Sequence, residues 1–260
     1  MAGLLRVELE AVNWLRDYGT GDTRPQLFVC RWRQRGDERW VLKLMGKADR
    51  ELAADWIGSL LAHRLGLRLP QVAIADLTPA ALRTCPADVR SWARPGPAFA
   101  SRELADASPV VSNAEMVALG SPEELGMMYA LDAWLDVVDR RKPDGVWNVL
   151  VDTASGQLNV LDFGKALASA MFVLFGDAEP ICDPLYPDSV KFAASRGAAL
   201  AMCDAIEAIS ADDVAEIVRS VPAAWLAESE RVRITAFLRG RIGCVREACQ
   251  RLDEVKPPWT

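Results

Sequence analysis

The sequence contains a single histidine and no closely spaced pair of cysteines. The histidine, His63, lies in the helical run Leu-Leu-Ala-His-Arg-Leu, and we expect it on the surface of that helix. A zinc site of the usual Cys and His ligands, or a catalytic triad built on histidine, would have to use this one side chain, which argues against both. Because the six cysteines are scattered and no Cys-x-x-Cys motif occurs, we expect reduced thiols.

The sequence also lacks an excess of positive charge and any long apolar run. Its formal net charge is −6 and its pI is about 5.0, whereas proteins that bind nucleic acid usually present a basic face. No apolar stretch approaches the roughly 20 residues that span a bilayer, and the N-terminus carries too many charges for a signal peptide. We therefore expect a cytoplasmic protein that binds neither nucleic acid nor a membrane.

What is present is enough apolar residues, 51% of 260, for a substantial core. The first part of the chain alternates apolar and polar residues as strands do, whereas the later part mostly has helical spacing. This order predicts an α+β fold in two lobes: a small β-rich N-lobe over residues 1–77, an inter-lobe connector over 78–114, and a mainly helical C-lobe over 115–260. The expected elements are a hairpin at 27–45, a helix at 49–65 with Asp49 as its N-cap, a strand at 71–77, a helix at 122–138, a hairpin at 147–162, and helices near 188–208, 211–219 and 227–253.

Lys43 stands near the end of the alternating run Arg-Trp-Val-Leu-Lys-Leu. Because successive side chains of a strand point to opposite faces, Val41 and Lys43 share one face. One interpretation is an edge-strand lysine that prevents association with another sheet. The other is a lysine that binds nucleotide phosphates, with Val41 beside it, and that pairs with a carboxylate of the next helix.

That helix offers Glu51 and Asp55, which are four residues apart and therefore lie on one face. Either could pair with the lysine, and a plain solvated acidic face is the alternative.

The stretch Tyr-Gly-Thr-Gly-Asp-Thr precedes the first hairpin and holds two glycines among small hydroxyl residues. Such a turn can present backbone N–H groups to phosphate oxygens. The candidate phosphate contacts are Gly19, Thr20, Gly21 and Thr23. An ordinary turn explains the same residues equally well.

The second hairpin carries a metal-capable side chain at each end. Asn148 opens its first strand and Asp162 closes its second, with a turn at Ala-Ser-Gly between them. Because a hairpin brings its two ends together, we expect both side chains at one end of it. Carboxylate and amide oxygens suit Mg²⁺, which also binds phosphates.

The loop before this hairpin contains two candidate bases, Asp139 and Asp144. Asp139 follows the preceding helix directly, so we expect it to be held more firmly. Asp144 lies in a Pro-Asp-Gly sequence, which is typical of an exposed turn whose Asp bonds to its own backbone.

The order of these parts is that of protein kinases: a glycine-bearing turn, a strand lysine, a helix carboxylate, a loop aspartate, an asparagine, and then Asp-Phe-Gly after an apolar strand. Each part alone is weak evidence, and the order makes the set specific.

The chain resembles the HipA-like kinases, a bacterial branch of the protein-kinase-like fold. The resemblance is carried by YGTGDTRPQLFV, VLKLM with RELAADWIGSLLAHRLGLRLP, RPGPAFASR, DAWLDVVDRRKPDGVWNVLVD, LNVLDFGKAL and the tail IVRSVPAAWLAESERVRITAFLRGRI. It implies ATP and Mg²⁺ as cofactors, Lys43 and Asp139 as catalytic residues, and Asn148 and Asp162 as metal ligands. The sequence departs from the family in having Asp55 where Glu is usual and eight residues, where four are usual, between Asp139 and Asn148.

These features predict an ATP- and Mg²⁺-dependent phosphotransferase whose acceptor is a hydroxyl, most simply that of Ser or Thr on a protein. A small-molecule acceptor is an alternative, although related small-molecule kinases usually have a histidine before the catalytic aspartate, and none occurs here. A third hypothesis is a kinase-fold module that binds a nucleotide or a partner protein and has little or no catalytic activity.

Overall fold

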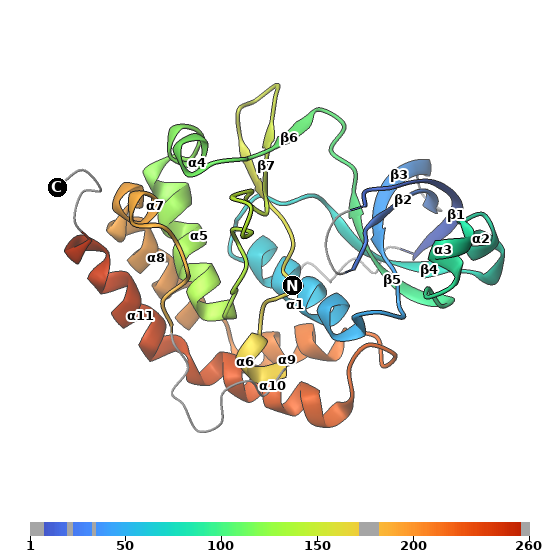
Figure 1. Cartoon of the computed structure of the whole chain (residues 1–260). Coiled ribbons are helices and arrows are strands. Elements are labelled where there is room, and N and C mark those ends of the chain that lie inside the picture. The colour runs from blue at the N-terminus through green and yellow to red at the C-terminus, as the bar shows by residue number, and fades with distance from the viewer. Residues whose placement is uncertain (1–7, 20–22, 33–34, 172–181, 256–260) are drawn as a thin grey trace.

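Five strands from the N-terminal part of the chain close into a barrel, drawn in blue to green in Figure 1. The computed structural model describes residues 8–19, 23–32, 35–171 and 182–255. The barrel order is β1-β2-β3-β5-β4, and only β1 and β4 pair in parallel. These strands are β1 (Glu8–Asp17), β2 (Gln26–Trp32), β3 (Gly36–Lys43), β4 (Val72–Leu77) and β5 (Gly96–Arg102). Alternate residues point inward, so Phe28, Trp40 and Leu42 fill a core that the barrel shares with the segment containing the short helices at 79–90.

Helix α1 (Asp49–Arg64) follows β3, as predicted, and Gly66 follows its end with a φ of +82° that favours glycine. The prediction that Asp49 is the N-cap was wrong by one residue. Ala48 occupies the N-cap position, and the carboxylate of Asp49 accepts a 2.7 Å hydrogen bond from the backbone N–H of Gly46. His63 is exposed in the last turn of α1, as expected.

The segment 78–114, expected to be a connector, contributes directly to the barrel. It contains α2 (Pro79–Arg83), α3 (Ala87–Arg90), β5, β6 (Ala107–Pro109) and the start of α4 (Asn113–Leu119). Its Pro, Ser and Arg content suggested irregular structure, but β5 pairs on one side with β3 and on the other with β4. This strand is rich in small residues, which fit the crowded barrel interior. Small residues give only a weak alternation of apolar and polar positions, so the sequence did not predict the strand.

The hairpin expected at 147–162 is present as β7 (Val149–Asp152) and β8 (Leu158–Val160), with β6 as a third strand beside β7. The helix expected at 122–138 is α5 (Pro122–Leu135), which begins with a Ser121–Glu124 capping box. It ends before residue 138 because Asp136 adopts a left-handed φ of +55°.

Helices make up most of the remaining described chain. They are α6 (Ala168–Met171), α7 (Asp188–Ala193), α8 (Arg196–Glu207), α9 (Ala211–Arg219), α10 (Glu228–Gly240), α11 (Ile242–Gln250) and the short 3₁₀ helix Arg251–Glu254. The single helices expected near 188–208 and 227–253 are each divided: the first at Ala194 and Ser195, the second at Arg241. The content of helices and strands fits the predicted α+β class.

Helix α1 lies across the middle of the molecule, between the barrel and the other helices (Figure 1), and most of its residues are buried. The indole N–H of Trp56 on α1 donates to the Ser220 hydroxyl at 2.8 Å. The indole N–H of Trp225 donates to the carbonyl of Pro97 in β5 at 3.0 Å. The segment after α9 therefore contacts both α1 and the barrel.

The cysteines correct one expectation. Cys182 and Cys244 form a disulfide, although the sequence suggested reduced thiols. Their separation of 62 residues hid this pairing, because only the packing of the loop before α7 against α11 brings them together.

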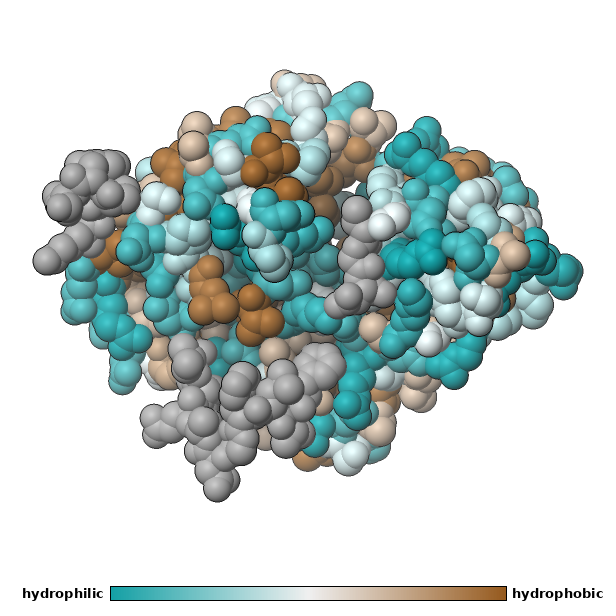
Figure 2. Space-filling view, in the orientation of Figure 1, coloured by the Kyte–Doolittle hydropathy of each residue, from teal (hydrophilic) through white to brown (hydrophobic). Residues whose placement is uncertain are grey.

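Hydrophilic side chains dominate the barrel part of the face in Figure 2, and hydrophobic groups gather over the helical part. None of the helices in the described ranges combines the length and apolar character that crossing a membrane requires. The surface is hollowed between the barrel and the rest of the molecule (Figure 2).

Candidate active site

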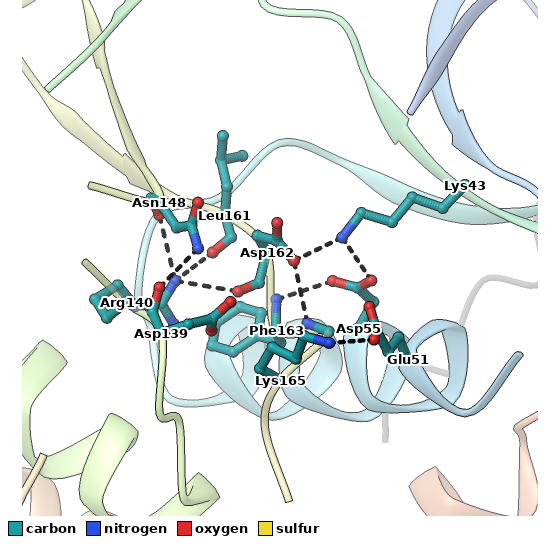
Figure 3. Close-up of polar contacts among 11 residues, drawn as sticks. Lys43, Glu51, Asp55, Asp139, Arg140, Asn148, Leu161, Asp162, Phe163 and Lys165 are labelled. Atoms are coloured by element: carbon teal, nitrogen blue, oxygen red, sulfur yellow. Dashed lines mark hydrogen bonds and ion pairs between the residues drawn. The ribbon is translucent and has the colours of Figure 1, made fainter. Parts of the chain in front are cut away.

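Lys43 is a buried lysine held by two carboxylates. It ends β3, which lies between β2 and β5 in the closed barrel, so the edge-strand interpretation was wrong. Its Nζ lies 2.8 Å from Oδ2 of Asp55 and 2.6 Å from Oδ1 of Asp162 (Figure 3). Burial alone would lower the pKa of Lys43, but the charges of Asp162 and Asp55 raise it above its ordinary value. The lysine therefore remains charged.

Helix α1 presents its two carboxylates to different lysines, which settles the choice that the sequence left open. Asp55 pairs with Lys43, and Glu51 pairs with Lys165, directly after the Asp-Phe-Gly motif. Asp is long enough here because α1 is packed tightly against the site. Oδ1 of Asp55 also accepts a 2.8 Å hydrogen bond from the backbone N–H of Phe163.

Asp55 has an unusual environment for an ionised group. Burial raises its pKa to about 7, and Lys43 opposes this effect while the charge of Asp162 adds to it. Asp55 thus holds both Lys43 and the backbone of the Asp-Phe-Gly turn, while its own charge is costly to bury.

The hairpin brings Asn148 and Asp162 to the same end, as predicted. The backbone N–H of Leu161 donates to the carbonyl of Asn148 at 3.0 Å. Asp162 itself adopts a left-handed φ of +53°, which is strained for a residue other than glycine, and strain of this kind concentrates at functional sites. The backbone N–H of Gly164 supports this turn with a 3.2 Å bond to Oδ1 of Asp162.

Gly58 on α1 makes room for the Asp-Phe-Gly turn. A Cβ at this position would lie 2.5 Å from the Phe163 side chain, so only glycine allows the ring to pack this closely on the helix. The phenylalanine is 1% exposed and belongs to the large core beneath the site.

Asp139 lies next to Asn148 despite the long separation in sequence. The side-chain amide of Asn148 donates to the backbone carbonyl of Asp139 at 2.9 Å. The extra residues between them form a turn in which the backbone N–H of Val146 donates to Asp144 at 3.1 Å. Asp144 is exposed, so the predicted Pro-Asp-Gly turn is confirmed.

One oxygen of the Asp139 carboxylate lacks a hydrogen-bond donor. Its Oδ1 is buried and has no hydrogen-bond partner among the described residues. Burial and the nearby charge of Asp162 raise the pKa of Asp139 to about 6, although Arg140 and two lysines oppose the shift. A buried acceptor without a donor is suited to receive the proton of an arriving hydroxyl.

Arg140 organises this loop, and sequence reasoning missed its role. Its guanidinium forms two 2.8 Å bonds with the buried carboxylate of Asp132 on α5. It also donates to the carbonyl of Leu161 and lies 4.7 Å from the centre of the Phe163 ring. Tyr186 completes the group by donating to Asp132 at 2.6 Å. The sequence did contain an indication of this group of residues, because Asp132 stands alone as a charged residue in the otherwise apolar middle of α5.

The glycine-bearing turn is only partly described. Thr20 and Gly21 lie outside the described residues. Gly19 has a φ of +67° and donates to Asp17 at 2.6 Å, while Thr23 is buried. In the described part of this turn, neither residue bonds to Lys43, Asp55 or Asp162. Val41 is half-buried on the same strand as Lys43.

The donor set fits a magnesium ion shared with phosphates. The described residues contain no group of three or more His, Cys, Asp or Glu side chains that could hold a metal alone. Mg²⁺, however, is commonly bound by one or two protein oxygens together with substrate phosphates and water. Oδ2 of Asp162 takes part in none of the bonds above, and Asn148 supplies an amide oxygen at the same end of the hairpin.

Comparisons with known proteins identify a family and a similar fold. A family model described as HipA-like kinase matches residues 12–251. The crystal structure of the Helicobacter pylori proinflammatory kinase CtkA aligns with a TM-score of 0.60 and 12% identity, covering 96% of this chain and 98% of that one. At this identity the alignment shows a shared fold alone. The FAT and kinase domain of CtTel1 aligns with a TM-score of 0.47 and 13% identity, covering 94% of this chain and 22% of that one.

No curated protein matches the sequence. The family model spans nearly the whole chain and includes each residue of the site described above. The chain therefore belongs to the HipA-like kinase family.

Proposed function

We propose that the protein is an ATP- and Mg²⁺-dependent phosphotransferase that transfers the γ-phosphate of ATP to a hydroxyl group, that of Ser or Thr on a protein. The observation that carries the proposal is the buried Lys43 bound to both Asp55 and Asp162. It joins the barrel, α1 and the Asp-Phe-Gly turn at one point. Asp139 and Asn148 lie in contact beside this point.

Each part of the site has a role in this reaction. Lys43 holds the α- and β-phosphates, and its raised pKa keeps it cationic while it does so. Asn148 and Asp162 hold Mg²⁺, which neutralises charge on the phosphates. Gly19, Thr20, Gly21 and Thr23 are proposed to contact the phosphates, and Val41 to line the nucleotide site.

Asp139 acts as the general base. It accepts the proton of the acceptor hydroxyl while the hydroxyl oxygen forms a bond to the γ-phosphorus. The bond between that phosphorus and the bridging oxygen breaks, and its electron pair leaves with ADP. Arg140 keeps Asp139 in place by joining the loop to α5 and to the hairpin.

We further propose that the barrel part and the helical part act as the two lobes of a kinase, with the nucleotide between them. Residues 1–77 and 115–260 would be the lobes, and 78–114 the connecting part that also completes the barrel. The protein acceptor and the cytoplasmic location remain predictions from the sequence.

The two aspartates of the loop provide a matched test. D139N should lower kcat by at least about a hundredfold while binding of Mg-ATP is kept, since general-base catalysis contributes about 10²–10⁴-fold. D144N should leave kcat within a few-fold, because Asp144 is exposed and bonds to its own turn. Both are measured as phosphate transfer from ATP, with a thermal melt in Mg-ATP as the binding control.

The outcomes also separate the alternatives. Transfer to proteins of a host lysate supports the proposal, whereas transfer only to small metabolites would indicate a small-molecule kinase. Binding of Mg-ATP with no transfer by the wild type, and no effect of D139N, would favour a module that binds without catalysis.

A further inference from the structure

Helix α1 holds two lysines in the same way. Asp55 binds Nζ of Lys43, and Glu51, one helical turn earlier, binds Nζ of Lys165 at 2.5 Å. The two lysines come from different parts of the chain, one from strand β3 and the other from the residue after Gly164. One face of α1 therefore places two ammonium groups around Asp162 (Figure 3).

Lys165 is placed on the reactive side of this arrangement. In Figure 3 it lies below Asp162, with Glu51 on one side and Asp139 on the other. Its side chain is 34% exposed, compared with 9% for Lys43, so a ligand that arrives from solvent can reach it.

The fold itself gives little reason for this second pair. The turn at Asp162 is already fixed to α1 by the bond from Phe163 to Asp55, and to the barrel by Lys43. The Lys165 side chain is 34% exposed, so solvent screens this ion pair and limits what it adds to stability. The role that remains for Glu51 is to hold Lys165 beside Asp139 and Asp162.

We infer that Lys165 is a second phosphate-binding lysine, held by Glu51 as Lys43 is held by Asp55, and that it contacts the γ-phosphate of ATP. This inference rests on the proposed function, because it requires ATP in the site. Lys43 serves the α- and β-phosphates, so the phosphate nearest to Asp139 is left for Lys165. The ammonium group can bond to Glu51 and to a phosphate oxygen together, since it has three N–H donors.

The inference predicts that Lys165 distinguishes ATP from ADP. Dissociation constants for Mg-ATP and Mg-ADP are measured by calorimetry on the wild type, K165Q and the control K191Q. Lys191 suits the control because it also pairs with a carboxylate, Asp183 at 2.9 Å, but lies on α7. K165Q should weaken Mg-ATP binding about tenfold or more and leave Mg-ADP within about threefold, since bonds to charged groups contribute about 1.5–3 kcal/mol. K191Q should change neither.

Other outcomes would overturn the inference. Equal weakening of both nucleotides, or wild-type preference for ATP in K165Q, would show that Lys165 does not contact the γ-phosphate. A melting curve of each variant checks folding, and a K165Q protein that does not fold would make Lys165 structural. K165R, which keeps the charge, should keep the preference for ATP, and loss of the preference in this variant would contradict a role based on charge. If the wild type binds neither nucleotide, the proposed function itself fails. If the wild type binds ATP and Lys165 contributes nothing to that binding, only the inference about Lys165 fails.

Discussion

Removing the charge of Asp139 should make the protein more stable while it removes activity. The buried Oδ1 of Asp139 has no partner, and burial together with the charge of Asp162 raises its pKa from 3.8 to about 6. Each tenfold change in proton affinity corresponds to about 1.4 kcal/mol, so keeping Asp139 ionised costs the folded state about 3 kcal/mol. Asparagine carries no charge but still leaves a polar atom unpaired, at about 1 kcal/mol or more. We therefore expect D139N to gain about 1–2 kcal/mol of unfolding free energy.

The gain should depend on pH in a defined direction. The pKa of Asp139 is higher in the folded than in the unfolded protein, so its ionisation lowers stability as pH rises between these two values. Below about pH 4, where Asp139 is protonated in both states, D139N should be about 1–2 kcal/mol less stable than the wild type, and its full gain should appear above the folded pKa of about 6. At about 2–4 °C per kcal/mol, D139N should melt about 2–8 °C higher than the wild type at pH 8.

The assay is a series of thermal melts of wild type, D139N and D144N without nucleotide from pH 4 to pH 8. D144N controls for loss of a negative charge from the same loop, and its melting temperature should follow the wild type at every pH. A D139N protein that is less stable than the wild type at pH 8, or a gain that does not change with pH, would refute the reasoning.

Further predictions concern the other groups of the site. D162N should still fold, because Lys43 keeps its ion pair with Asp55. The variant should lower phosphate transfer by at least about a hundredfold, because it removes the anionic metal ligand. Normal transfer by a folded D162N protein would refute the metal assignment. Mg-ATP at 100 times its Kd should stabilise the wild type by about 2.7 kcal/mol, and K43A should reduce this shift in a melt. R140M should destabilise the fold by about 3–5 kcal/mol in urea unfolding, because it leaves the carboxylate of Asp132 buried without its charged partner. The value of kcat/KM should fall as pH drops below about 6, where Asp139 becomes protonated, and a flat profile would argue against Asp139 as the base.

The sequence predicted the parts of the site that depend on local pattern. Strand alternation placed Lys43 on the face opposite Trp40 and Leu42, and the hairpin signal brought Asn148 and Asp162 to one end. The Pro-Asp-Gly sequence predicted that Asp144 lies in an exposed turn, and this distinguished it from Asp139. In each case a few adjacent residues fix the geometry.

The sequence could not supply what depends on packing between distant segments. The choice between Glu51 and Asp55 was open because both lie on one face of α1, and only the depth at which this helix packs decides it. The bond between Arg140 and Asp132 depends on how the loop returns over α5. Strand β5 was missed because its small residues carry a weak pattern, and its place is fixed by pairing with two other strands.

The central claim is that these residues transfer phosphate from ATP. The most direct measurement is mass spectrometry of phosphorylated products after wild type, D139N and D162N are each incubated with Mg-ATP and a lysate of the source organism. The account predicts new phosphoserine or phosphothreonine with the wild type, dependent on Mg²⁺, and a loss of at least about a hundredfold with either variant. No phosphorylated product with a folded wild type that binds Mg-ATP, or the same products with D139N and D162N, would contradict it.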